Sequence, residues 1–289
     1  MCDLESVWTQ GGGAKAMSYV MLSRVQCIEQ LFILKKLDPK RIFISKEALI
    51  EHEKMEKKSL NRNPTNWEKE EQVLKIAFLN IQSIRNKLLY LAADKMMLKG
   101  DVIALGETWL ESDVVDPVLN LPGYQLRLNS WKHGSRGVGT YFKPDKLFEV
   151  TDIKTDMVQI TKISSADFDV INIYRSPQAT NAVDSDLVVR LDSLIDQSRQ
   201  TIIGGDLNIC FNKKKVHMVL VYLDSLGFDQ LTTTATHIEG GVLDLVFSNH
   251  AILKKYEVNT QLYSPYYTFK DHDAVLVSVS LVGSKSLYK

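Results

Sequence analysis

The stretch Thr201-Ile-Ile-Gly-Gly-Asp-Leu-Asn-Ile209 is the most informative segment of this sequence. Its short apolar run predicts a buried β-strand, and the two glycines allow a sharp turn and a close approach to a bulky neighbour. Asp206 and Asn208 are two positions apart, so on an extended chain they point to the same side. An acid beside an amide at the rim of a sheet is typical of α/β active sites. Gly-Gly-Asp is also ordinary turn chemistry, so its meaning depends on the rest of the chain.

The composition fits a globular protein with a sizeable core. The chain has 289 residues, 45% of them hydrophobic and 24% charged, which suits one large or two smaller soluble domains. Its 35 Lys and Arg residues balance its 35 Asp and Glu residues, so net charge favours neither a nucleic acid nor a membrane as partner.

The three cysteines are far apart and form no CxxC pair, which argues against a disulfide framework or a zinc cluster and indicates a reducing compartment. No apolar run reaches the ~18–20 residues that span a bilayer. The amino-terminal segment lacks the basic and apolar regions of a secretory signal. We therefore expect no membrane partner.

The pattern divides the chain near residue 72. Residues 1–51 alternate short apolar runs with turns and are too few to bury a full core alone. Residues 52–72 are polar and charged, which predicts a linker. Residues 73–289 form a second domain with an α/β pattern.

In this second domain we expect helices over residues 83–98, 183–197 and 216–226, the first with Ser83 as N-cap and Gly100 as C-cap. A β-strand is expected from Thr201 into the Gly-Gly-Asp motif. The other expected strands are residues 73–79, 101–106, 124–128, 137–142, 157–163, 169–174, 243–247 and 274–282. One helix followed by many β segments favours a sandwich of mixed sheets with outer helices over a doubly wound sheet.

Polar residues interrupt or end the apolar runs of this domain at several places. They are Asn80, Glu107, Tyr174, Asp206, Asn208, Asp244, Asp271 and His272. Each alone has an ordinary structural explanation, such as a turn histidine or a satisfied buried carboxylate. Together they form an oxygen-rich set, and charged groups are rarely buried unless they are paired or bind metal. Such a set suits Mg²⁺ or Mn²⁺, and a hard cation beside a His and an Asp is suited to attack on a phosphate ester.

The ordered motifs NIQS, GETWL, NIYRSP, GGDLN, VLDLVFS and KDHDAV resemble the endonuclease/exonuclease/phosphatase family. Within that family they look most like the apurinic-type endonuclease domains of non-LTR retrotransposons. The resemblance implies a four-layer sandwich of two mixed β-sheets flanked by helices, with a single catalytic divalent cation. It implies a DNA endonuclease from a transposable element. Two alternatives remain: a phosphatase of small phosphoesters, since the same fold hosts both, and an inactive remnant that only binds DNA.

The resemblance also implies roles for the acids and amides of the set. Glu107 is expected to be the principal metal ligand, helped by Asn80 and Asp271. Asp206 is expected to deprotonate or orient the attacking water. Asn208 is expected to hold this part of the site and to contact the phosphate.

The remaining roles concern the phosphate itself. By the same resemblance, His272 stabilises charge on the phosphoryl oxygens, Asp244 orients it, and Tyr174 contacts the phosphate. A paired carboxylate raises the basicity of an imidazole and fixes its tautomer. Asp206 is therefore expected to lie near both His272 and Glu107 in the folded chain.

Contacts to DNA are expected from two basic segments. Lys213, Lys214 and Lys215 follow the Gly-Gly-Asp motif and can meet a DNA backbone, although such a charge run is equally typical of a solvated helix start. Arg136, near Trp131, precedes a Gly-Val-Gly strand and belongs either to a rim loop that meets DNA or to a surface turn.

The first part of the chain has a resemblance of its own. KAMSYVMLSRVQCIEQLFIL resembles the last conserved motif of helicases of the Helitron type, with Arg24 in the place of an arginine finger. The chain contains no GxxxxGK[ST] phosphate loop, so we expect no ATP binding. Residues 1–51 are interpreted as a helicase C-terminal remnant, and the combination resembles the Helentron subgroup of transposons. A DNA partner implies a nuclear or cytoplasmic, intracellular location.

Overall fold

The computed structural model describes most of the second expected domain: residues 74–132, 136–146, 149–211, 216–265 and 271–282. The expected helicase remnant (residues 1–51) and linker (52–72) lie outside the described residues, and so do Lys213, Lys214 and Lys215. All the described residues belong to the unit that begins at Pro64.

The first of two six-stranded sheets has the strand order β11-β12-β1-β2-β4-β3. Its strands are β1 (Leu74–Asn80), β2 (Val102–Gly106), β3 (Gln125–Asn129), β4 (Val138–Phe142), β11 (Tyr256–Tyr263) and β12 (Ala274–Leu281). β1 and β2 are parallel, and all other neighbours are antiparallel. This sheet is therefore mixed.

The second sheet has the order β5-β6-β7-β8-β10-β9. Its strands are β5 (Glu149–Lys154), β6 (Val158–Ser164), β7 (Phe168–Arg175), β8 (Gln200–Asp206), β9 (Asp229–Gln230) and β10 (Asp244–Ser248). Here β7 and β8 are the parallel pair, and the other neighbours are antiparallel. Each sheet thus has one parallel pair near its centre.

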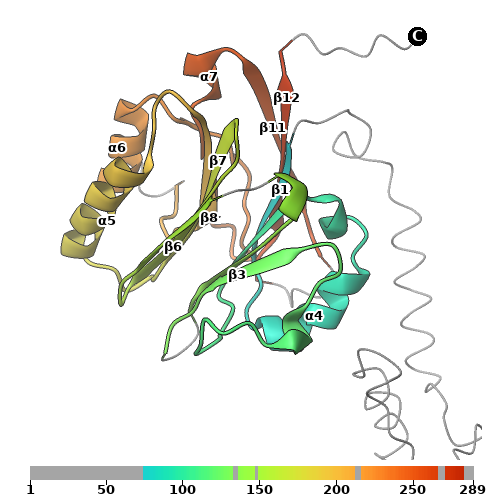
Figure 1. Ribbon diagram of the computed structural model, residues 1–289. Helices are drawn as coiled ribbons and strands as arrows, with labels where there is room; N and C mark the ends of the chain where they lie inside the picture. The colour runs from blue at the N-terminus through green and yellow to red at the C-terminus, as the bar shows by residue number, and fades with distance from the viewer. Residues whose placement is uncertain (1–73, 133–135, 147–148, 212–215, 266–270, 283–289) are drawn as a thin grey trace, which may run out of the picture. The chain divides into compact units, whose positions relative to one another are not determined.

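Helices cover the outer face of each sheet (Figure 1). The α-helices are α4 (Ile84–Ala93), α5 (Asn181–Leu194), α6 (Met218–Ser225) and α7 (His250–Leu253). Three single 3₁₀ turns, η3 (Met97–Lys99), η4 (Pro117–Leu119) and η5 (Pro144–Lys146), lie in the connections. Among the described residues no helix is both long and apolar enough to cross a membrane.

Alternation along the strands explains why the sheets stack into layers. In β1, Ile76 and Phe78 belong to the apolar cluster between the sheets, and Ala77 and Leu79 belong to the cluster under α4. Successive side chains of a strand point to opposite faces, so a strand that is apolar throughout is buried on both faces. A third cluster packs α5 and α6 on the second sheet. The expected four-layer sandwich of two mixed β-sheets flanked by helices is confirmed.

The two glycines of the opening motif allow the close packing that was expected of them. A Cβ on Gly204 would lie 2.7 Å from the ring of Phe78, so β8 can approach β1 of the other sheet only because this side chain is absent. Gly205 has φ +130°, and a Cβ there would meet the carbonyl oxygen of Ile173 on β7. Both positions favour glycine for steric reasons.

The helix expected over residues 83–98 is wrong in its second half. The Asp94 carboxylate accepts a hydrogen bond from the backbone N–H of Met97 (3.1 Å), which diverts the chain into η3. Short acidic side chains compete with helical hydrogen bonds in this way. Ser83 is the N-cap residue of α4, as expected, although its side chain makes no capping hydrogen bond. The expected C-cap is wrong, because Asp94 ends α4 and Gly100 ends η3.

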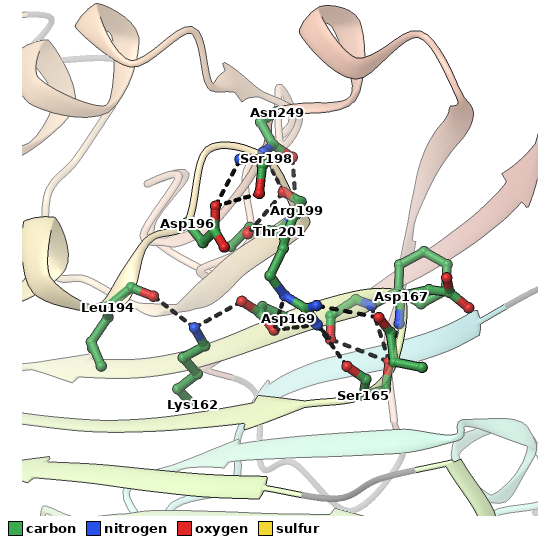
Figure 2. Close-up of polar contacts among 12 residues, drawn as sticks. Lys162, Ser165, Asp167, Asp169, Leu194, Asp196, Ser198, Arg199, Thr201 and Asn249 are labelled. Atoms are coloured by element: carbon green, nitrogen blue, oxygen red, sulfur yellow. Dashed lines mark hydrogen bonds and ion pairs between the residues drawn. The ribbon is translucent and has the colours of Figure 1, made fainter.

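A buried ion network ties the second sheet together at the start of β7 and β8 (Figure 2). The Asp169 side chain is fully buried and pairs with Lys162 Nζ (2.7 Å) and Arg199 Nη2 (3.0 Å). Lys162 also donates to the carbonyl oxygen of Leu194 at the end of α5 (2.7 Å). Arg199 donates to the Ser165 carbonyl oxygen (2.6 Å). The network therefore joins β6, β7, β8 and α5.

The substitution Asp169→Asn is expected to lower the free energy of unfolding by about 3 kcal/mol, because Lys162 and Arg199 lose their buried partner. Asp186→Asn is the matched control. Its pair with Arg190 on α5 is half-exposed, so a loss of at most about 0.5 kcal/mol is expected. Urea unfolding measures both variants, and equal midpoints for the two would contradict a stabilising role of the network.

Candidate active site

The polar residues singled out in the sequence gather at one end of both sheets. Asn80 ends β1, Asp206 ends β8, and Glu107 follows β2 directly. The carboxyl ends of parallel strands meet at one edge, which is where α/β proteins place their sites. The antiparallel strands β10 and β12 begin at this edge, so Asp244 and His272 join the group.

Asp206 and Asn80 form the centre of this group. Asn80 Nδ2 donates a hydrogen bond to Asp206 Oδ2 at 2.8 Å, across the interface between the two sheets. Both side chains are buried. Burial raises the pKa of Asp206 to about 7, and the negative charges of Asp244 and Glu107 act in the same direction. A buried carboxyl that exchanges a proton near neutral pH is suited to general acid–base work.

His272 and Asp244 form a buried pair next to Asp206. The His272 Nδ1–H donates to Asp244 Oδ2 at 2.7 Å, since a carboxylate can only accept. His272 Nε2 lies on the side of Asn80, 3.5 Å from its Nδ2. Burial lowers the pKa of His272, but the hydrogen bond and charge of Asp244, then Asp206 and Glu107, outweigh it and raise the pKa to about 9. The imidazole is therefore positively charged at neutral pH.

This charge can be measured directly. In the metal-free protein, NMR titration of the His272 ring is expected to give a pKa near 9, and Asp244→Asn is expected to lower it because the stabilising carboxylate is lost. Addition of Mg²⁺ is expected to lower the pKa as well, since a nearby cation repels the imidazolium. A ring that titrates at its ordinary pKa with and without Mg²⁺ would contradict this description.

Glu107 faces the same space from β2. Its strand neighbour Gly106 pairs in register with Asn80, and its charge raises the pKa of Asp206 and of His272. Its backbone has φ +51°, a left-handed conformation that is uncommon outside glycine. The Ser83 N–H donates to the Glu107 carbonyl oxygen (2.9 Å), which holds this turn in place.

The group has the donor atoms that a divalent cation requires. Asn80 Oδ1 is buried without a hydrogen-bond partner among the described residues, and a buried carbonyl oxygen of this kind is satisfied by a cation. Ligand atoms of Asp206, Asp244 and His272 also lie within 4.8 Å of one another. This set differs from the expected trio of Glu107, Asn80 and Asp271, which stays a prediction.

Asp271 lies on the Glu107 side of the group. Its Oδ2 accepts a hydrogen bond from Gln82 Nε2 at 3.3 Å. Burial lowers the pKa of Lys87, while the charges of Asp271 and Glu107 both raise it. Asp271 and Glu107 therefore both lie near the positive charge of Lys87.

Asn208 is close to Asp206 in a way that the sequence did not predict. β8 ends at Asp206, and Asn208 has φ +51°, so the expectation that both side chains point to one side of an extended chain is wrong. Instead the Asn208 backbone N–H donates to Asp206 Oδ1 at 3.0 Å. Its side-chain Nδ2 donates to the Arg175 carbonyl oxygen at 2.9 Å. Asn208 thus fixes the carboxylate of Asp206.

Arg175 supports this turn and had no role in the sequence interpretation. Its buried guanidinium binds both carboxylate oxygens of Asp184 on α5 (2.6 and 3.0 Å) and donates to the Leu207 carbonyl oxygen (3.3 Å). His217 Nε2 reaches the same carboxylate at 3.1 Å. The only sign of this supporting role in the sequence is that a charged residue ends the apolar run before Ser176-Pro177.

Tyr174 and Arg136 are the remaining expected residues within the described ranges. Tyr174 is buried at the end of β7; burial, then the charges of Glu107 and Asp206, raise its pKa, so its hydroxyl stays protonated. Arg136 is partly exposed, and its guanidinium donates to the Asp156 carbonyl oxygen. Its charge lowers the pKa of Tyr174, which places it on the same side of the molecule.

Comparisons with known proteins identify the family and the fold. The model of the endonuclease/exonuclease/phosphatase family matches residues 77–265. An AP endonuclease from Archaeoglobus fulgidus superposes with a TM-score of 0.56 at 18% identity, covering 73% of this chain and 100% of that one. The endonuclease domain of TRAS1, a telomere-specific non-LTR retrotransposon, gives 0.56 at 14% identity, covering 72% and 98%. A Neisseria 3′ phosphatase bound to a product DNA hairpin gives 0.55 at 16%, covering 72% and 100%. No curated protein matches the sequence.

Proposed function

This chain belongs to the endonuclease/exonuclease/phosphatase family, and we propose that it is a divalent-metal-dependent endonuclease that hydrolyses phosphodiester bonds of DNA. The observation that carries the proposal is the buried contact of Asp206 with Asn80, next to the His272–Asp244 pair. It combines a carboxyl that titrates near neutral pH with a positive charge in one site. A base for water and a positive charge near the phosphoryl oxygens both favour hydrolysis of a phosphate ester.

The proposed cation is Mg²⁺ or Mn²⁺, held by Glu107, Asn80 and Asp271. Oxygen donors select such hard cations, and the free Asn80 Oδ1 is one such donor. When bound, the cation would stabilise negative charge on the phosphoryl group and on the attacking oxygen.

The protein's own residues would divide the rest of the reaction. Asp206 accepts the proton of the attacking water, and the Asn208 N–H keeps its carboxylate in position. The His272 imidazolium faces the charge that develops on the phosphoryl oxygens, and Asp244 holds its orientation. Tyr174 keeps its hydroxyl proton and can donate a hydrogen bond to the phosphate. The water oxygen bonds to phosphorus as the P–O3′ bond breaks, and the leaving oxygen takes a proton from solvent, which gives a 5′-phosphate and a 3′-hydroxyl on the cut strand.

DNA is the proposed partner, through Arg136 and Lys213, Lys214 and Lys215. The support for DNA is the motif resemblance to retrotransposon endonucleases and the similar fold of the TRAS1 domain. The same resemblance supports an origin in a transposable element. Phosphoester hydrolysis without strand cleavage is the second candidate, because a 3′ phosphatase bound to DNA has the same fold.

Plasmid nicking separates the two candidates. The full chain is incubated with supercoiled plasmid and Mg²⁺, and in parallel with a small phosphomonoester whose phosphate release is measured. The proposal expects open-circular plasmid that EDTA abolishes, with little phosphate release. Phosphate release without nicking would assign the site to a phosphatase, and the absence of both reactions would reject hydrolysis altogether.

Arg175→Lys is expected to lower the nicking rate by up to about 100-fold, because a lysine cannot bind both oxygens of Asp184 and also hold the turn at Leu207. Arg190→Lys, at an exposed pair on α5, is the matched control. Initial rates are read together with melting temperatures. A full rate in Arg175→Lys would contradict the positioning of Asn208 through this residue.

A further inference from the structure

Trp109 places an aromatic ring at the rim of the site, where it touches one of the acids. Its indole Nε1–H donates to Glu107 Oε2 at 3.2 Å. The side chain is 41% exposed, whereas the neighbouring Thr108 and Leu110 are buried. Trp109 belongs to none of the three hydrophobic clusters formed by the described residues. The ring is therefore presented to solvent and does not fill the core.

The loop that carries this ring is fixed in an uncommon backbone conformation. Glu107 and Trp109 have φ +51° and +55°, and such conformations persist only where the surroundings impose them. Ile84 N–H donates to the Thr108 carbonyl oxygen (3.1 Å), and Trp109 N–H donates to the Arg136 carbonyl oxygen (3.0 Å). The loop is thus tied to α4 on one side and to the start of β4 on the other. These bonds fix the backbone from which the indole projects.

The chemistry of the indole limits the classes of ligand that it can bind. A rigid indole offers two apolar faces, and its one polar atom is already bonded to Glu107. Phosphate oxygens and sugar hydroxyls gain little from such a face, whereas planar bases stack on it. We propose that Trp109 determines substrate class by stacking on a nucleobase next to the scissile phosphate. This inference rests on the proposed nuclease function and extends it to base-bearing substrates.

The experiment compares two fluorescein-labelled single strands of equal length in EDTA: oligothymidylate, and a chain of abasic spacers with the same phosphates. Fluorescence anisotropy gives the Kd of the full chain and of its Trp109→Ala and Trp109→Phe variants. Trp109→Ala is expected to weaken binding of oligothymidylate by about 5- to 100-fold. Its affinity for the spacer chain is expected to stay within about twofold. Trp109→Phe keeps a stacking face and is expected to retain most of the affinity for oligothymidylate.

Equal weakening of both strands in Trp109→Ala, or of neither, would overturn the inference, and so would failure of the unmodified chain to bind oligothymidylate. Nicking of plasmid in Mg²⁺, measured on the same preparations, keeps the proposed function separate. Nicking without base-dependent binding would reject the stacking inference and leave the proposed nuclease function intact. Base-dependent binding that requires Trp109, without nicking, supports the stacking site and rejects the nuclease. Trp109→Phe also loses the indole N–H. This loss is expected to lower the kcat of nicking rather than the affinity for oligothymidylate.

Discussion

Asp206→Asn is expected to lower the rate of phosphodiester hydrolysis by about 100- to 10,000-fold. The substitution keeps the shape of the side chain but leaves one acceptor oxygen, which can serve the Asn80 amide (2.8 Å) or the Asn208 N–H (3.0 Å) and not both. It removes the group that can take a proton from water. Burial raises the pKa of this carboxyl to about 7, so ionised Asp206 costs stability in the folded state. Removal of this buried charge offsets the one lost hydrogen bond, so Asp206→Asn is expected to melt close to the temperature of the unmodified chain.

The control for Asp206 is Asp229→Asn, an exposed acid on β9 of the same sheet. Initial rates on plasmid at fixed Mg²⁺ and thermal melts are recorded for both variants. A general loss of stability in Asp206→Asn, with a proportional loss of rate, would mean that Asp206 is structural. Loss of rate with unchanged or higher melting temperature is the signature of a functional acid.

His272→Gln is expected to lower the rate by about 100- to 1000-fold, because the positive charge next to the phosphoryl oxygens disappears. In the metal-free protein the raised pKa, about 9, means that this charge is present throughout the neutral range. Asp244→Asn is expected to cost less, about 10- to 100-fold, since it removes the group that orients the ring.

The double variant tests whether His272 and Asp244 act as a pair. If Asp244 works through the His272 ring, the double variant loses no more than His272→Gln alone, because coupled residues are not additive. Single-turnover rates of nicking give the three values. Losses that multiply would show that Asp244 acts independently, for example as a direct ligand of a cation in the cluster with Asp206.

The buried strands could be predicted from the sequence because their apolar runs leave little alternative. β1 and β8 are apolar on both faces and were found where expected. β5 and β11 were missed, because their side chains are largely exposed or half-buried and their pattern resembles a surface loop. The early end of α4 depended on one carboxylate, Asp94, that bonds to its own backbone. Periodicity does not detect a local bond of this kind.

The proximity of Asp206 and His272 could be predicted, because the motifs that contain them lie at strand ends and follow the order of the family that the sequence resembles. Their ligand atoms lie within 4.8 Å of one another. The positioning of Asn208 could not be predicted, because it depends on a left-handed turn and on the carbonyl of Arg175 in another strand. This contact joins residues that are distant in the sequence, so no local pattern indicates it. The roles of the gathered residues remain predictions that the variants above test.

The rate of plasmid nicking as a function of Mg²⁺ concentration, for the full chain and for Asp206→Asn, tests the proposed metal-dependent site most directly. We predict that EDTA abolishes nicking by the unmodified chain and that Mg²⁺ restores it. Asp206→Asn is predicted to stay at least about 100-fold slower at every Mg²⁺ concentration. Nicking that survives EDTA, or an Asp206→Asn variant that cuts at the full rate, would contradict a single metal-dependent hydrolytic site built around Asp206.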